Sequence, residues 1–570
     1  MITVTIKAAE KVNGDFSAFI SFPYDANLIS IIRDQPARFW HAEIKQWEIP
    51  VAKLVPFLNQ TGRRDVTITG EQTLKMNPIT SELNGFRFKT DPLNHQIEGL
   101  DYGLKKDCFL LGDEQGLGKT KQSIDIAVAR KLRDGMSRCL VICGVNGIKW
   151  NWVNEIAKHS DEKVYVLGTR YTKRDHKAFI GSNQDRLDDL NNLPDALFIV
   201  TNVETLRYTQ RVTNLDTGKT KEFFPIAEKL HEMCDLDEIG MVVIDEIHKC
   251  KDPSSLQGEA IQALTSKVRI AMTGTPLMNT PLDLYIVLRW LGFERHSFYQ
   301  FRKHYCVFGG YGGNEIVGYR YLDELKESLD GLMLRRLKKD VLDLPEKFHT
   351  TEFVEMQPKQ AKIYAEVRAA LKDDIDKIKL SPNPLSQLIR LRQATGYTGI
   401  LSTTVKVSAK LDRMVELVEE LVANGEKAII FSNWTEITNP AYERLKQYNP
   451  AIITGQTTNR MEEKERFMTD PNCKVIIGTI GAMGTGITLT AGNTVIFLDS
   501  PWNRALKEQA EDRAHRIGTT GNVNVITLVC KGTIDERVEQ LIDRKGKMSD
   551  MLVDGTIDIG RSDVVDFLLD

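Results

Sequence analysis

The stretch that decides the interpretation of this chain is Leu111-Gly-Asp-Glu-Gln-Gly-Leu-Gly-Lys-Thr120. The apolar run that ends at Leu111 predicts a buried strand before it. The residues after it predict a helix with one apolar face, made by Ile124, Ala127, Val128 and Leu132. A glycine-rich turn between a strand and a helix brings backbone N–H groups and the positive end of a helix dipole close to a phosphate. The alternative is an ordinary glycine-rich turn.

Individual residues of this stretch match the general phosphate-loop pattern of Gly, four residues and then Gly-Lys-Ser/Thr. Asp113 stands where the first Gly would be, whereas Gly118 fits. Lys119 is expected to neutralise the β and γ oxygens of a nucleotide, and Thr120 to bind Mg²⁺. The candidate nucleotide-binding residues of the loop are Asp113, Glu114, Gln115, Gly116, Leu117, Gly118, Lys119 and Thr120.

A second candidate element is the run Met241-Val-Val-Ile-Asp-Glu-Ile-His248. It places two adjacent acids at the end of a buried strand, where ionised carboxylates are costly unless a cation or a reactant uses them. We expect Asp245 to hold Mg²⁺ and Glu246 to orient or deprotonate an attacking water. The alternative is a solvated acidic turn.

Cations that approach the transferring phosphoryl group are expected from a later helix. Gln509, Arg513 and Arg516 fall at i, i+4 and i+7, which predicts one face of one helix after Pro501. The two arginines are candidate arginine fingers, a contribution of about 10³ to 10⁵ in rate. The alternative is a surface face that pairs with neighbouring acids.

Length and composition bound the organisation of the chain. The 570 residues correspond to three or four domains of about 150 residues. A content of 42% hydrophobic and 27% charged residues is typical of folded globular proteins. Short apolar strands that alternate with helical segments predict an α/β fold with two parallel-sheet lobes. We expect a small α+β module over 1–84, lobes over 85–280 and 406–570, and a helical insertion with a connector over 281–405.

The overall charge and the cysteines identify no partner. Lys plus Arg (75) against Asp plus Glu (78) leave a net charge of −3, so any nucleic-acid site must be a local patch. The eight cysteines are scattered without CxxC pairs, which favours reduced thiols and no structural zinc. No apolar run reaches the roughly 18 residues of a membrane span, and Met1 to Glu10 lacks a signal-peptide core. We therefore expect a cytoplasmic protein, associated with the nucleoid if the source is bacterial or viral.

A series of blocks, in order and over about residues 90 to 545, resembles the motifs of the SNF2 family of ATP-dependent DNA translocases in helicase superfamily 2. The blocks are Leu93–Gln96 with Gly99, Asp113–Thr120, Leu140–Glu155, Asp245–His248 with Lys251, Met272–Asn279, Leu334–Lys347, Ala428–Ser432, Gly478–Leu489 and Gln509–Gly518. Departures from the family pattern at Ile247, Met278, Asn503–Arg504 and Thr519 leave the phosphate, metal and arginine residues in place and bear on coupling to DNA.

The resemblance implies two RecA-like lobes that close on ATP and Mg²⁺ while neighbouring faces grip duplex or branched DNA. It implies that Gln96 recognises the adenine. The residues that it implies at the DNA phosphates are Lys149, Lys251, Asn433, Thr479 and Trp502. We expect a monomer with no membrane contact. The activity left open includes strand rewinding or fork remodelling, strand separation, removal of proteins from DNA, and ATP binding without turnover.

The first module has a narrower resemblance, to the HARP domain of annealing helicases. It is carried by Phe19–Phe22, Tyr24–Asp25, Leu28–Ile29, Arg38–Trp40 and Lys45–Trp47. This resemblance implies recognition of forked DNA, with stacking by Trp40, Trp47 and Phe57 and phosphate contacts by Arg38, Lys45, Arg63 and Arg64. The alternative is that both tryptophans pack the core of the module.

Overall fold

The structure is a computed structural model, whose described residues fall into two compact units. One unit holds residues 1–105, 124–136 and 158–161, and the other holds the remainder. The described residues are 2–8, 11, 16–33, 35, 38–50, 54, 57–58, 61, 66–70, 86–144, 149–172, 178–213, 220–275, 280–309, 313, 315–342, 344–373, 388–484, 487–516, 518–519, 521–540 and 542. None of the helices described over these residues is long and apolar enough to span a membrane.

The N-terminal module contains a five-stranded sheet with the order β3-β4-β2-β1-β5 and the helix α1. Its elements are β1 (Ile2–Ala8), β2 (Phe16–Ser21), α1 (Ala26–Arg33), β3 (Phe39–His41), β4 (Gln46–Pro50) and β5 (Val66–Gly70). The sheet and the helix give this module the α+β fold expected from sequence. Alternation along β1 buries Ile2 and Val4, which pack with Leu28 and Ile32 of α1 and with Phe57.

Two further helices of this unit pack on each other. They are α4 (Asn94–Lys105) and the later part of α5 (Lys119–Asp134). The Arg130 Nε and Nη2 both donate to the Gly103 carbonyl, at 3.1 and 2.8 Å. A Cβ at Gly103 would meet the Ile126 side chain, so the close contact of the two helices needs glycine there.

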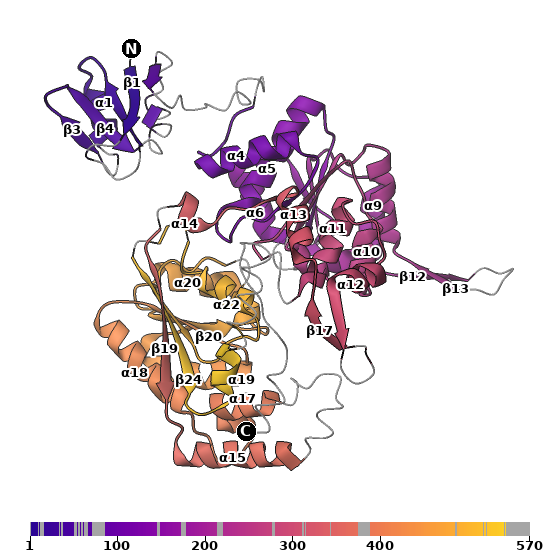
Figure 1. Ribbon diagram of the computed structural model, residues 1–570, viewed down its shortest axis with the longest axis vertical. Coiled ribbons are helices and arrows are strands. Elements are labelled where there is room, and N and C mark those ends of the chain that lie inside the picture. Colours follow the sequence, from indigo (N-terminus) through magenta and orange to yellow (C-terminus); the bar gives the residue numbers. More distant parts are fainter. Residues whose placement is uncertain are drawn as a thin grey trace. The chain divides into compact units, whose positions relative to one another are not determined.

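The first lobe is built on a seven-stranded parallel sheet with the order β18-β6-β15-β14-β7-β11-β8 (Figure 1). Its strands are β6 (Cys108–Leu111), β7 (Cys139–Cys143), β8 (Val164–Val166), β11 (Phe198–Asn202), β14 (Met241–Asp245), β15 (Val268–Met272) and β18 (Met333–Leu334). The strands β7 and β11 are buried at every position, as expected when both faces of a parallel sheet are covered.

The other elements of the first lobe are helices and short hairpins. The helices are α6 (Lys149–His159), α7 (Asn183–Asn191), α8 (Val203–Leu206), α9 (Pro225–Asp235), η2 (Ile247–Cys250) and α10 (Leu256–Gln262). The hairpins pair β9 (Thr169–Tyr171) with β10 (Ala178–Ile180) and β12 (Gln210–Thr213) with β13 (Thr220–Phe223).

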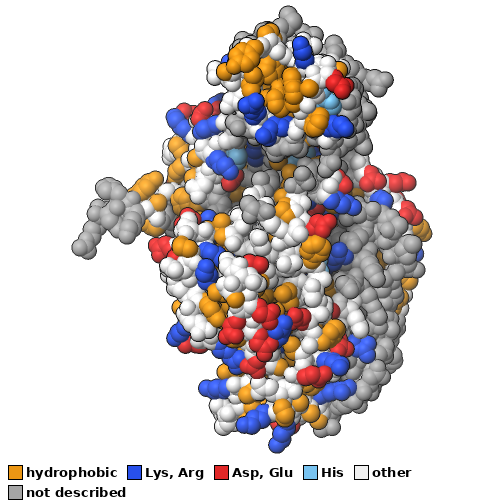
Figure 2. Space-filling model, turned by 90° about the vertical axis from the view of Figure 1, so that its left-hand side faces the viewer, with side chains coloured by type: hydrophobic (Ala, Val, Ile, Leu, Met, Phe, Trp, Pro, Cys, Tyr) orange, Lys and Arg blue, Asp and Glu red, His pale blue; other side chains and the backbone are white. Residues whose placement is uncertain are grey.

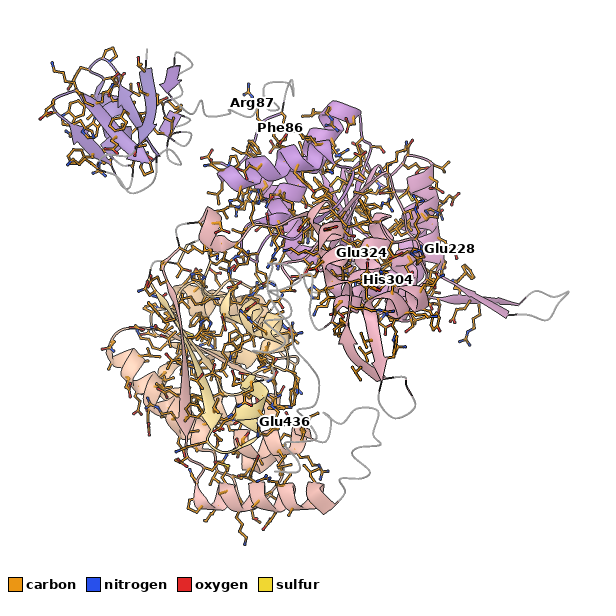
Figure 3. The ribbon with its side chains drawn as sticks, in the orientation of Figure 1. Phe86, Arg87, Glu228, His304, Glu324 and Glu436 are labelled. Atoms are coloured by element: carbon orange, nitrogen blue, oxygen red, sulfur yellow. The ribbon has the colours of Figure 1, made fainter. Side chains whose placement is uncertain are left out.

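The stretch 281–405 supplies helices, but also strands that sequence periodicity did not predict. It contains η3 (Pro281–Leu284), α11 (Tyr285–Leu291), α12 (Phe298–Tyr305), α13 (Leu322–Asp330), α14 (Lys338–Val341), α15 (Pro358–Asp373), α17 (Ile389–Gly396) and η5 (Thr398–Ile400). Strands β16 (Cys306–Gly309) and β17 (Glu315–Tyr319) form a hairpin. Near this hairpin, the His304 Nε2 of α12 lies 3.2 Å from the Glu324 Oε2 of α13 (Figure 3).

The second lobe is a six-stranded parallel sheet with the order β19-β24-β23-β20-β22-β21. Its strands are β19 (Lys347–Val354), β20 (Ala428–Ser432), β21 (Ala451–Ile453), β22 (Val475–Thr479), β23 (Thr494–Phe497) and β24 (Val523–Cys530). The helices are α18 (Ala409–Ala423), α19 (Thr435–Arg444), η6 (Lys446–Tyr448), α20 (Arg460–Thr469), α21 (Ile480–Met483) and α22 (Arg504–Glu511). Successive residues of β20 enter two separate apolar clusters, so both faces of the sheet are covered.

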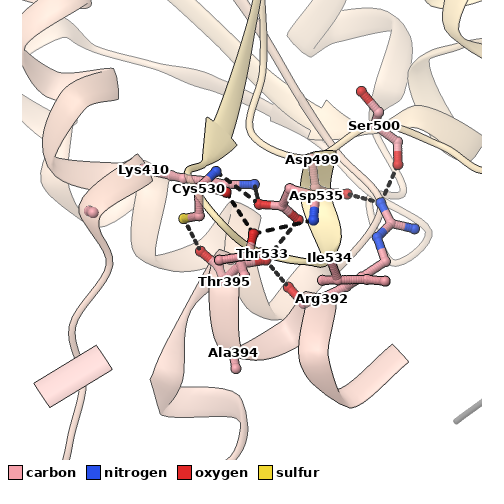
Figure 4. A network of polar contacts seen from close by, with 12 residues as sticks. Arg392, Ala394, Thr395, Lys410, Asp499, Ser500, Cys530, Thr533, Ile534 and Asp535 are labelled. Carbon is pink, nitrogen blue, oxygen red and sulfur yellow. Dashed lines mark hydrogen bonds and ion pairs between the residues drawn. The ribbon is translucent and has the colours of Figure 1, made fainter. Parts of the chain in front are cut away.

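A buried polar network braces the second lobe beyond the end of β24 (Figure 4). The Lys410 Nζ lies 2.6 Å from the Asp535 Oδ2, and both side chains are less than a tenth exposed. Thr395 donates to the same carboxylate at 2.9 Å. Because an isolated buried charge is costly, each of these groups depends on the others.

Candidate nucleotide-binding and DNA-binding sites

The candidate nucleotide site of the first lobe forms at three adjacent strand ends. Strands β6, β15 and β14 are neighbours, and Leu111, Met272 and Asp245 lie level in register. The segments that follow these strands therefore leave one edge of the sheet side by side. Ligands of open α/β sheets bind at this carboxyl edge.

The loop after β6 wraps around the Lys119 ammonium group. Gly116 and Gly118 have φ of +88° and +76°, which residues with a Cβ rarely adopt. The Lys119 Nζ donates to the carbonyls of Asp113 and Glu114 at 2.7 and 3.3 Å. Burial lowers the pKa of Lys119, and the carboxylates of Glu246, Asp113 and Asp245 oppose this shift. The Lys119 amine thus has acidic neighbours, and it lies in the loop that we expect to bind phosphate.

Asp245 ends β14 as predicted and Glu246 follows it, and the two acids have different surroundings. The Trp152 indole Nε1 donates to the Asp245 Oδ2 at 2.9 Å. Burial and the adjacent Glu246 charge raise the pKa of Asp245. Glu246 has φ +52°, and its Oε2 lies 3.2 Å from the His248 Nδ1. Burial lowers the pKa of His248 to about 3, so this imidazole is neutral at pH 7.

Three side chains of the second lobe reach this edge of the first lobe. The Gln509 Nε2 lies 3.4 Å from the Glu246 Oε1. The Arg513 Nη2 donates to the Gln115 Oε1 at 3.0 Å, and a Cβ at Gly116 would lie 3.5 Å from the Arg516 Cγ. These contacts bring three side chains of the second lobe to the loop and the β14 end of the first lobe.

The prediction that they share one helix is wrong. Helix α22 ends at Glu511, so Arg513 and Arg516 follow it in a turn. There the Arg513 Nε donates to the Gln509 carbonyl at 3.0 Å and its Nη1 donates to the Ile487 carbonyl at 3.3 Å. The Arg516 Nη1 donates to the Thr488 Oγ1 at 3.0 Å. Contacts with the 487–488 segment, rather than helical spacing, aim the two guanidinium groups.

The connector after β18 contributes cations that sequence reasoning did not place at the site. The Glu114 N–H donates to the Arg336 carbonyl at 3.0 Å. The Arg335 Nη1 donates to the Gly112 carbonyl at 2.9 Å. The Lys338 Nζ lies 2.7 Å from the Asp512 Oδ2, and its backbone N–H donates to the Glu114 carboxylate at 2.7 Å. The signal in the sequence that could have placed these cations at the site was the dense run of Arg and Lys directly after a short apolar pair.

Two predicted nucleotide residues have surroundings that qualify their roles. The carboxylate of Asp113 is fully buried, and its two oxygens accept from Arg336 and Gln122. Its carbonyl, not its side chain, faces Lys119. Gln96 is buried in the first turn of α4, where its Oε1 accepts from the Leu93 N–H at 3.0 Å.

The donor set suits a hard cation at the nucleotide. The half-buried Asp245 carboxylate is partly removed from water, which is costly for its charged form, and the half-buried Thr120 lies beside Lys119 at the start of α5. Carboxylate and hydroxyl oxygens are the ligands that Mg²⁺ takes when it also binds phosphates. These two residues therefore fit the ion that we expected from sequence.

The predicted DNA contacts in the first lobe are tied to protein groups. Lys149 is only 3% exposed, its Nζ donates to the Asn202 Oδ1 at 3.3 Å, and burial lowers its pKa. In this conformation its ammonium group is not at the surface, which corrects the expectation of a phosphate contact there. Lys251 is half-buried and lies 3.1 Å from the Asp283 Oδ2.

The predicted DNA contacts in the second lobe gather at strand ends. Asn433 follows β20, and its amide donates to the Asp499 carboxylate and, at 3.0 Å, to the Ser500 carbonyl. Thr479 ends the neighbouring β22 and is 9% exposed. Trp502 is half-buried, with the Arg392 guanidinium 4.5 Å from its ring centroid. Asn433 and Thr479 lie at one edge of the sheet, whereas the contacts of the Asn433 and Trp502 side chains are with protein groups.

The aromatic residues of the N-terminal module divide between core and surface. Phe57 is fully buried, so the expectation that it stacks on a base is wrong. Trp47 is half-buried and packs on Trp40 with ring centroids 5.0 Å apart. Trp40 itself is 43% exposed and Phe39 41%. Figure 2 shows the side of the module that carries β3, where hydrophobic side chains gather beside Lys and Arg side chains.

Some residues quoted from sequence lie outside the described residues. They are Arg63, Arg64, Met278 and the Thr485–Gly486 pair.

Comparisons with known proteins identify the class of the chain. Residues 95–398 match the SNF2-related domain, and residues 409–518 match the helicase conserved C-terminal domain. Because the first match alone spans more than half of the chain, the chain belongs to the SNF2 family.

Several relatives are similar at moderate identity. A Mycoplasma pneumoniae protein named as an uncharacterized ATP-dependent helicase is 28% identical, over 80% of this chain and 41% of its own length. The mouse DNA annealing helicase and endonuclease ZRANB3 is 25% identical, over 82% of this chain and 41% of its own. A Caenorhabditis elegans homologue of SWI/SNF-related regulator of chromatin subfamily A-like protein 1 is 26% identical, over 96% of this chain and 77% of its own. The chain thus spans about two fifths of the length of the first two.

A solved structure is also similar. The Sulfolobus solfataricus SWI2/SNF2 ATPase core in complex with dsDNA is 26% identical, over 82% of this chain and 94% of that chain, with a TM-score of 0.36.

Proposed function

We propose that the chain is an ATP-driven translocase on double-stranded or branched DNA. The observation that carries the proposal is the contact of Gln509 and Arg513 with Glu246 and Gln115, at 3.4 and 3.0 Å. Residues of both lobes thereby border one site, so that binding and hydrolysis of a nucleotide change the contact between the lobes. Such a cycle is what moves two DNA grips relative to each other.

The proposed chemistry is hydrolysis of the bond between the β and γ phosphates. Glu246 orients a water and takes its proton as the oxygen attacks the γ phosphorus, and the leaving group is ADP. Lys119 and the loop N–H groups hold the β and γ oxygens, and Arg513 and Arg516 offset the charge that develops there. A magnesium ion held by Thr120 and Asp245 would neutralise phosphate charge when bound. Gln96 is proposed to recognise the adenine.

The test is ATP turnover with and without duplex DNA. We expect DNA to stimulate the purified chain, and Glu246→Gln to abolish turnover while nucleotide binding persists, because the amide cannot accept the proton. Gln262→Met, in α10 of the same lobe, is the control and should turn over like the parent. Turnover that ignores every polynucleotide would contradict the proposal, as would full turnover after loss of both Arg513 and Arg516.

A second proposal is that the motor rewinds or remodels forks. It is favoured by the exposed Phe39 and Trp40 of the N-terminal module, and by the name of the relative ZRANB3, an annealing helicase. We expect Trp40→Ala to lower the preference for forked over plain duplex DNA, because base stacking contributes about 1–3 kcal/mol per base. Phe57→Leu in the module core is the control for folding. An unchanged fork preference would leave this module without that role.

Two strand assays separate the remaining activities. A translocase without strand separation displaces a third strand from a triplex and leaves a tailed duplex intact. Efficient unwinding of the tailed duplex would favour a strand-separating helicase. Displacement of a tightly bound protein without any fork effect would favour a motor that strips DNA.

A further inference from the structure

The side chain of Gln115 carries a buried hydrogen-bond donor for which the binding of phosphates by backbone N–H groups gives no use. The residue is 8% exposed, and its two polar ends differ. The Oε1 accepts from the Arg513 Nη2 at 3.0 Å. The Nε2 is buried and has no hydrogen-bond partner among the described residues. A buried donor without an acceptor is costly, and a ligand that supplies the acceptor removes that cost.

The orientation of this amide follows from chemistry. The oxygen and nitrogen of a glutamine are often interchangeable in a structure, but a guanidinium has only donors. Whichever amide atom faces Arg513 must therefore be the oxygen. The NH₂ group is left on the other side of the side chain.

The surroundings of Gln115 indicate what the NH₂ group meets. A Cβ at Gly274 would lie 2.5 Å from the Gln115 Cγ and 3.2 Å from the Lys119 Nζ. The Gln115 side chain and the Lys119 ammonium group thus both lie against Gly274. Since Lys119 is the residue proposed for the β and γ oxygens, the Gln115 amide borders the same volume.

We infer that Gln115 links the terminal phosphate of the nucleotide to Arg513: its NH₂ group donates to a γ-phosphate oxygen while its carbonyl holds the guanidinium in place. This inference rests on the proposed function and adds a side chain that distinguishes a triphosphate from a diphosphate. ADP lacks the acceptor, so the amide loses its partner after phosphate release. The contact between the lobes then depends on which nucleotide is bound.

The test compares binding of ADP and of the β,γ-imido analogue of ATP to the full chain. We expect Gln115→Met to leave ADP affinity within about twofold, to weaken the analogue about tenfold and to lower DNA-stimulated kcat about 10²-fold, as for loss of one donor to developing charge. Gln115→Glu keeps an acceptor for Arg513 and removes the donor, so it should lose the preference for the analogue as well. Retained ADP binding shows that the loop is folded.

Other outcomes overturn the inference. Equal weakening of ADP and analogue would mean a structural role of Gln115 in the loop. A Gln115→Glu variant that prefers the analogue as the parent does would exclude donation by the amide. Higher turnover of Gln115→Met without DNA would mean that the carbonyl only restrains Arg513. The control is Gln262→Met. In the parent chain the Gln262 Nε2 donates to the Gly258 carbonyl at 3.2 Å, a contact that involves no residue of the nucleotide loop. Absence of turnover in the parent chain would instead count against the proposed function, since the binding comparison needs no hydrolysis.

Discussion

Arg336 forms a two-pronged contact with Asp113, in which Nε and Nη2 lie 3.0 and 2.6 Å from the two carboxylate oxygens. Asp113 stands where the general phosphate-loop pattern has glycine. The pair explains this departure, because the connector is fastened to the base of the loop through that carboxylate. A buried charged contact therefore holds the connector against the loop.

Restoring the general pattern with Asp113→Gly is expected to damage the protein. It removes the carboxylate that balances the charge of the half-buried Arg336 guanidinium, and loss of one member of a buried pair costs about 3–5 kcal/mol. Chemical unfolding of the variant should show this loss, and Asp113→Gly with Arg336→Gln should regain part of it. A single variant as stable as the parent would mean that the contact carries no stability.

Gly274→Ala is expected to impair turnover more than folding. The added methyl group would lie 2.5 Å from the Gln115 Cγ and 3.2 Å from the Lys119 Nζ, so the loop must shift. Since misplacement by about 1 Å costs about 10²-fold in rate, we expect a drop of that order in kcat with a small change in melting temperature. The matched control is Gly331→Ala, where the methyl group meets no described atom within 4 Å. Equal turnover of both variants would contradict the close contact.

Acidification should destabilise the first lobe through His248. Burial lowers its pKa from the ordinary 6.5 to about 3, so below pH 6.5 the unfolded chain binds a proton that the folded chain refuses. The stability is whole above pH 6.5 and falls as the pH decreases toward 3; at pH 5 the loss from this group is about 2 kcal/mol. Urea unfolding at pH 7.5 and pH 5 should show a smaller difference for His248→Gln. Identical pH profiles would exclude this origin.

Lys410→Met is expected to destabilise the second lobe. The substitution leaves the Asp535 carboxylate buried without its cation, at a cost of about 3–5 kcal/mol (Figure 4). The added change Asp535→Asn should recover part of the loss, because the amide carries no charge. The exposed pair of Lys446 and Glu443 is the control, since exposed ion pairs contribute about 0–1 kcal/mol. Equal drops in melting temperature after Lys410→Met and Lys446→Met would contradict the role of the buried network.

Sequence patterns predicted most elements that carry the site. The apolar runs ending at Leu111 and Asp245 became β6 and β14, because continuous apolar runs in an α/β chain are buried strands. The patterns missed β18 and β19 in the connector. Strand β18 has two residues and β19 is mostly exposed. Neither therefore shows the apolar pattern from which a strand is predicted.

The sequence by itself determined which chemical groups are present and on which type of element each lies. The reason is that local spacing sets whether a residue ends a strand or begins a helix. Only the tertiary structure decided which of them meet. The pairs Arg513–Gln115 and Arg336–Asp113 join residues 398 and 223 positions apart. The burial of Lys149 and Phe57 is equally non-local. Such contacts arise from packing of whole sheets and turns, which short-range periodicity does not encode.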